Sequence, residues 1–125
     1  MKELTKAEEQ IMQILWGLEK GFVNDILDIL PLPKPAYNTV STIVRILERK
    51  GFVGHKAYGK THEYYPLISK RDYTKTYFKG FMNNYFGNSY QALASFFTKE
   101  NSLSIEELEE IRTLMDAQIK KQKDN

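Results

Sequence analysis

Apolar residues recur at helical spacing over three successive stretches in the first half of the chain. The periodicity predicts three helices, over residues 5–18, 22–30 and 37–50. Thr5 and Glu8 form a capping-box pattern at the start of the first helix. Gly51 follows the third helix at the position where helices commonly end. The proline-rich segment 31–35 cannot continue a helix, so it is expected to be an extended connection or turn.

A different pattern, typical of β-strands, follows the third predicted helix. Two short β-prone runs, residues 52–58 and 61–66, flank Gly59-Lys60. This arrangement predicts a β-hairpin, which has Lys60 at its tip. Three helices followed by a two-stranded hairpin is the order of a winged helix-turn-helix.

The second half of the chain has helical periodicity again, interrupted near Gly87-Asn88. It predicts three further helices, over residues 69–85, 89–97 and 105–121. Ser104 and Glu107 form a second capping box, which opens the last of them. The predicted fold is mainly α with a small β-hairpin. A winged helix-turn-helix DNA-binding domain over residues 1–70 is followed by a helical dimerisation region over residues 71–125.

The third helix divides into an apolar and a polar face when successive residues are advanced by about 100°. Its buried stripe is expected to hold four residues, Val40, Ile43, Val44 and Leu47. The outward face carries groups that match base edges in the major groove. We expect four side chains to read bases: Asn38, Ser41, Thr42 and Arg45. We expect three to hold phosphates: Thr39, Arg49 and Lys60. A solvent-exposed helix face is also polar for ordinary reasons, and that explanation stays open here.

Charge adds to this interpretation through its distribution, because the net charge is only +2. Residues 34–63 hold six Lys or Arg and two Glu, a local charge of +4, whereas residues 99–125 hold five Lys or Arg and seven acids. The basic region is Lys34, Arg45, Arg49, Lys50, Lys56 and Lys60. A basic middle and an acidic end indicate one surface for a polyanion and another for a different partner.

Several classes of site are not expected. The chain has no cysteine, which excludes disulfides, thiolate zinc sites and a cysteine nucleophile. His55 and His62 flank the hairpin turn and can face each other, but two histidines without a third ligand make a poor metal site. No catalytic constellation and no cofactor motif is found, so an enzyme is not expected. No run approaches the ~20 apolar residues of a membrane span, and no signal peptide opens the sequence. We therefore expect a cytoplasmic protein.

Nine of the sixteen aromatic residues lie between Tyr73 and Phe97. An apolar stripe also runs along the last predicted helix through Leu108, Ile111, Met115 and Ile119. Large exposed apolar patches are rare on monomers, so these stripes predict a homodimer interface in preference to a ligand pocket. Its expected residues are Tyr77, Phe78, Phe81, Tyr85, Leu108, Ile111 and Met115.

The sequence resembles the penicillinase repressor family of bacterial transcriptional regulators. The resemblance is carried in order along nearly the whole chain by LTKAE at 4–8, ILW at 14–16, NTVSTI at 38–43, LERKGFV at 47–53, EYYPL at 63–67, ASFF at 94–97 and LSIEELEEI at 103–111. It implies a homodimeric repressor with one winged helix per subunit, bound to an inverted-repeat operator. It further implies release by a membrane-bound sensor metalloprotease, which cuts the C-terminal region.

The chain departs from the family pattern at two places. The family's reading helix usually has Arg where this sequence has Ser41 and Ile46, which implies a different operator. The family's cleavage position aligns with Ser95-Phe96, where Asn is common ahead of the Phe and Ser stands here. Two other functions remain open, a winged-helix module for protein association and a repressor that senses a small ligand.

Overall fold

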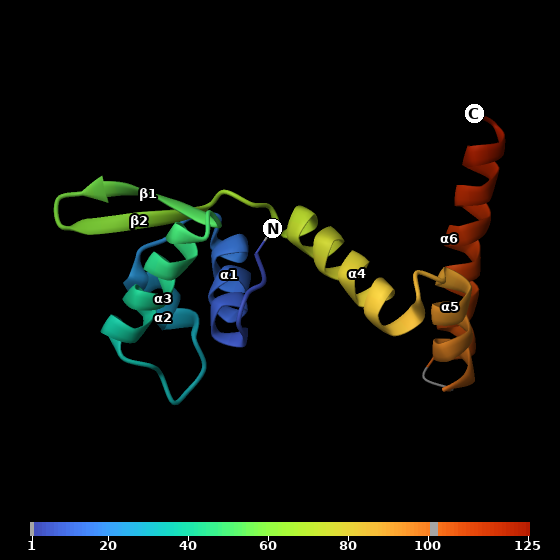
Figure 1. Cartoon of the computed structure of the whole chain (residues 1–125), viewed down its shortest axis with the longest axis horizontal. Helices are drawn as coiled ribbons and strands as arrows, with labels where there is room; N and C mark the ends of the chain where they lie inside the picture. The colour runs from blue at the N-terminus through green and yellow to red at the C-terminus, as the bar shows by residue number, and fades with distance from the viewer. Residues whose placement is uncertain (1, 101–102) are drawn as a thin grey trace. The chain divides into compact units, whose positions relative to one another are not determined.

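The computed structural model describes residues 2–100 and 103–125. Within these ranges the chain forms six helices and one hairpin (Figure 1). In order they are α1 (Lys6–Leu18), α2 (Val23–Ile29), α3 (Tyr37–Arg49), β1 (Val53–Tyr58), β2 (Thr61–Pro66), α4 (Lys70–Phe86), α5 (Tyr90–Lys99) and α6 (Ile105–Lys123). Each predicted element is present within two residues of its expected bounds, and the predicted fold class is confirmed.

The chain divides into two compact units between Tyr77 and Phe78, inside α4. The sequence placed its boundary earlier, between residues 70 and 71. The first turns of α4 pack with the N-terminal unit because Tyr73 is buried against the rings of Trp16 and Phe52, at centroid distances of 5.7 and 5.8 Å. The indole Nε1 of Trp16 also donates a hydrogen bond to the Ile68 carbonyl oxygen at 2.9 Å.

The core of the N-terminal unit gathers the apolar stripes of its first three helices and the base of the hairpin. Its buried residues are Ile11, Met12, Leu15, Val23, Ile26, Leu30, Val40, Val44, Leu47, Phe52, Val53, Tyr64 and Tyr73. Ile43 of the predicted stripe is only partly buried and packs against this core. Burial of this apolar surface stabilises the unit and fixes how α3 is rotated about its own axis.

The hairpin is antiparallel, with Val53 opposite Pro66 and Tyr58 opposite Thr61. Gly59 has φ +63° in the tight turn, a backbone conformation that favours glycine. A short bridge between Tyr64 and Gly21 ties β2 to the connection between α1 and α2, through two backbone hydrogen bonds of 2.8 and 2.9 Å. The base of the hairpin is therefore anchored, and its tip extends away from the core (Figure 1).

The C-terminal unit consists of the rest of α4 together with α5 and α6. Positive φ angles at Gly87 and Asn88 end α4 where the sequence predicted a break. Ser89 caps α5, and Ser104 with Glu107 forms the predicted capping box of α6. Met82 is fully buried in this unit. No helix in the described ranges is both long and apolar enough to span a membrane.

An ion pair joins the start of α1 to the end of α3. Glu8 is almost fully buried, and its Oε1 accepts hydrogen bonds from Lys50 Nζ at 2.6 Å and from the Thr5 backbone N–H at 2.9 Å. Burial raises the pKa of Glu8, but the hydrogen bonds from Lys50 and Thr5 and the charge of Lys50 outweigh it, so the pKa lies below its usual 4.5. The carboxylate therefore stabilises the fold in its charged form.

Replacing Glu8 by Gln is expected to lower the free energy of unfolding by about 1–3 kcal/mol at pH 7, because a charged hydrogen-bonding partner of Lys50 is lost. The folded-state pKa is depressed, so this contribution is present above the unfolded pKa and disappears as the pH falls through the folded value. Urea denaturation of the wild type and Glu8→Gln from pH 7 to pH 3 measures it. Glu9→Gln, one residue along, is the control and should change little. A Glu8→Gln penalty that does not shrink at low pH would contradict this account.

Candidate nucleic-acid interface

The outward face of α3 carries the polar side chains that the periodicity placed there. Asn38, Thr39, Thr42, Arg45 and Arg49 are exposed, and Ser41 is partly exposed. The opposite side of the same helix is buried through Val40, Val44 and Leu47. The helix thus presents one amide, three hydroxyls and two guanidinium groups to solvent on a fixed backbone.

Hydrogen bonds within α3 determine which of these groups remain free. The Thr42 hydroxyl donates to the Asn38 carbonyl oxygen at 2.8 Å, so its oxygen is left as an acceptor. An acceptor suits the exocyclic amino groups of adenine and cytosine. Arg45 Nε donates to the Ser41 carbonyl oxygen at 3.3 Å. The two terminal nitrogens of Arg45 remain available for a bidentate contact, such as that with guanine.

A groove of about 490 Å³ lies between the start of α2, the outward side of α3 and the tip of the hairpin. It brings Ser41 and Arg45 together with Lys60. Its full lining is Phe22, Val23, Asn24, Asp25, Tyr37, Ser41, Arg45, Lys60, Thr61, His62 and Tyr64. Cations, hydroxyls and aromatic rings thus surround one concave surface, which suits a sugar-phosphate segment.

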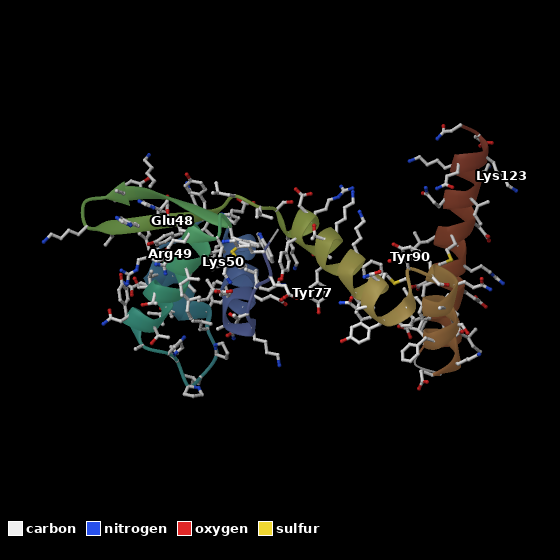
Figure 2. The ribbon with its side chains drawn as sticks, in the orientation of Figure 1. Glu48, Arg49, Lys50, Tyr77, Tyr90 and Lys123 are labelled. Atoms are coloured by element: carbon white, nitrogen blue, oxygen red, sulfur yellow. The ribbon has the colours of Figure 1, made fainter. Side chains whose placement is uncertain are left out.

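The other candidate DNA-contacting residues on α3 lie outside this groove. Thr42 and Arg49 line a second depression together with Arg45 and Glu48. Arg45 therefore lines both hollows. Asn38 and Thr39 lie on the exposed first turns of α3 and line neither of them. Figure 2 shows Glu48 and Arg49 where the end of α3 lies beneath the hairpin.

Two lysines of the basic region have structural partners. Lys34 Nζ donates to the carbonyl oxygens of Leu27, Asp28 and Leu30 at 2.6, 3.2 and 2.9 Å, at the C-terminal end of α2. A cation there satisfies carbonyls that the helix leaves unpaired. Lys50 is paired with Glu8. These partners could not be predicted from local sequence patterns, because they depend on how the proline-rich connection and the three helices pack.

Some groove residues were not predicted from the sequence. Three of them, Phe22, Asn24 and Tyr37, lie at helix ends, where the helical periodicity indicates no chemical role. His55 and His62 do face each other, as predicted, with parallel rings 4.2 Å apart. The described part of the chain holds no group of three or more His, Cys, Asp or Glu that could bind a metal ion. Burial, and then the nearby charge of Glu48, raise the pKa of Tyr64 above its usual 10.0, so its hydroxyl stays protonated.

The residues expected at a dimer interface fall on both units. Tyr77 is the last residue of the N-terminal unit, and the others lie in the C-terminal unit. Five of the seven are exposed: Tyr77, Phe78, Tyr85, Leu108 and Met115. Phe81 and Ile111 are partly exposed. Met82, on the same helix α4, is buried within its own unit.

The bond between Ser95 and Phe96 lies inside α5. The Ser95 carbonyl oxygen accepts a hydrogen bond from the Thr98 hydroxyl at 3.1 Å. The Phe96 side chain is about half exposed, and its ring meets that of Phe86 at 5.8 Å. This segment is regular helix. A peptide that pairs its backbone with another chain is extended, so residues 95 and 96 do not have that conformation here.

Comparison with known proteins places the chain among repressors. The family model of the penicillinase repressor matches residues 4–117. The methicillin resistance regulatory protein MecI of Staphylococcus aureus is 28% identical over 114 residues, which cover 90% of this chain and 93% of the relative. The penicillinase repressor of Bacillus licheniformis is 23% identical over 115 residues, 91% of this chain and 90% of the relative. The solution structure of the DNA binding domain of the repressor BlaI matches with TM-score 0.50 and 26% identity, over 58% of this chain and 94% of that domain.

Proposed function

The chain belongs to the penicillinase repressor family of transcriptional repressors, and from this premise we propose that it acts as a homodimer on an inverted-repeat operator in double-stranded DNA. The observation that carries the proposal is the groove that brings Arg45 of α3 and Lys60 of the hairpin to one concave surface. The names of the relatives, which refer to methicillin resistance and penicillinase, support genes of β-lactam response as its targets.

Each side chain of the interface has a role that its chemistry supports. Four residues of α3 would enter the major groove and read base edges: Asn38, Ser41, Thr42 and Arg45. Three would hold phosphates and position the domain: Thr39, Arg49 and Lys60. Because Arg45 lines both hollows beside α3, it is the residue from which we expect the largest contribution to specificity. Ser41 and Ile46 stand where the family usually has Arg, so the preferred operator would differ from the family's usual one.

A dimer accounts for the apolar residues that the C-terminal unit leaves exposed. Leu108 and Met115 on α6 are 38% and 53% exposed, and Tyr85 on α4 is 74% exposed. Exposed side chains of this size in one small unit support a protein partner, and a second copy would also place two reading helices on one operator. We propose residues 71–125 as the dimerisation region, with the first turns of α4 packed on the winged helix.

Release from the operator would follow from cleavage between Ser95 and Phe96 by a membrane-bound sensor metalloprotease. Both residues lie within α5, and its helical hydrogen bonds oppose the extended conformation of a protease substrate. Local unfolding of α5 would therefore precede cleavage. Removing α6 would take Leu108 and Met115 away from the dimer interface and weaken DNA binding.

Selection of bound sequences from a random duplex library, at about 150 mM salt, tests the proposed function. The expected result is an inverted repeat whose half-sites lie about one helical turn apart, because a symmetric dimer places its reading helices at that spacing. Sedimentation of the selected complex should give two chains per duplex. Enrichment of a single unrepeated half-site would contradict the dimer. Retention without any sequence preference would contradict specific reading by α3.

Substitutions at Arg45 and Lys60 separate base reading from phosphate binding on the selected operator. Arg45→Ala should lose about 1–3 kcal/mol of binding free energy and relax the preference at one base position. Lys60→Ala should weaken binding to all duplexes alike and reduce the slope of log affinity against log salt by about 1. Lys34→Gln is the matched control, because Lys34 caps α2 and is not a proposed contact. If Arg45→Ala and Lys60→Ala behave alike on every duplex, the division of roles is wrong.

A further inference from the structure

The DNA-facing side of α3 carries one acidic residue among its cations. Glu48 lines the same depression as Thr42, Arg45 and Arg49. A carboxylate at this place repels DNA phosphates. It is also three residues after Arg45, a spacing at which helical side chains reach each other and oppositely charged groups pair. Left free, Glu48 would therefore compete with DNA for Arg45.

The hairpin provides a different partner for this carboxylate. His55 Nδ1 on β1 pairs with Glu48 Oε2, and both side chains are about one-third exposed. The ring of His62 on β2 also stacks on one face of the His55 ring, at a centroid distance of 4.2 Å and an interplanar angle of 7°. The hairpin thus presents an imidazole in a fixed place against the end of α3.

The arginines beside Glu48 are left unpaired by this arrangement. Among residues 2–100 and 103–125, the one Lys or Arg side chain that pairs with a carboxylate is Lys50, with Glu8, and Glu48 pairs with His55. Arg45 donates to a backbone carbonyl of its own helix, and Arg49 has no acidic partner there. Glu48 and both arginines line one depression, yet the carboxylate pairs with the hairpin and with neither guanidinium.

We propose that His55 is a positioning residue for DNA binding, which holds the Glu48 carboxylate against the hairpin and thereby keeps Arg45 and Arg49 available to the operator. The inference rests on the proposed function of α3 as the DNA-reading helix. It assigns the hairpin a second role besides its own phosphate contact through Lys60. The imidazole is the hydrogen-bonding partner of the one carboxylate that lines this cationic depression.

The test compares operator affinity and its salt dependence for four proteins: wild type, His55→Ala, Glu48→Gln and the double variant. His55→Ala should weaken operator binding about fivefold to tenfold. Its salt slope should fall by about 1, because the freed carboxylate offsets the charge of Arg49, the proposed phosphate contact that lines the same depression. Glu48→Gln should bind at least as tightly as the wild type. The double variant should recover the affinity and salt slope of Glu48→Gln, because no carboxylate remains to be held.

Rescue by Glu48→Gln distinguishes this role from a structural one. If His55 only supported the shape of the hairpin, the double variant would bind as weakly as His55→Ala, and that result would overturn the proposal. Unchanged binding by His55→Ala would overturn it as well. Glu63→Gln in the His55→Ala background is the matched control, because Glu63 lies on β2 and is absent from the α3 depression, so it should give no rescue. A wild type that binds no duplex would contradict the proposed function itself.

Discussion

Val40, Val44 and Leu47 occupy the core of the N-terminal unit together with Phe52 at the base of the hairpin, and none of them exposes any surface. This packing is the constraint on which the DNA-binding account depends. A helix has one rotation about its axis that buries these three side chains, and that rotation directs Arg45 and Arg49 to solvent. The Phe52 backbone N–H also donates to the Leu47 carbonyl oxygen at 2.9 Å. The hairpin therefore begins at a fixed place relative to the reading helix.

In the folded N-terminal unit some cations have structural partners, and others remain available to bind a polyanion. Lys50 is held by Glu8 and Lys34 by carbonyls at the end of α2. Arg45, Arg49 and Lys60 remain exposed. The charge of +4 over residues 34–63 thus overstates the charge available to DNA. The positions of these exposed cations explain the proposed interface better than the total charge does.

Periodicity was sufficient to predict the helices, the hairpin and the polar face of α3, because each depends on residues close together in sequence. The stop at Gly87-Asn88 was predictable for the same reason. The partners of Lys34, Lys50 and Glu48 were not, because each is set by segments that meet only in the folded chain. Tyr73 shows why local sequence patterns did not predict where the two units divide. It lies beyond residue 70, in the predicted dimerisation region, yet contacts with Trp16 and Phe52 bring it into the winged-helix core.

The most direct test of the central claim is an NMR titration of the ¹⁵N-labelled protein with an operator duplex. The largest amide shifts should fall on the exposed positions of α3 and on the hairpin turn at Gly59 and Lys60. Amides of α1 on the far side of the core should change little. Shifts concentrated in α5 and α6, with α3 unchanged, would contradict that claim and identify the helical region as the surface that meets DNA.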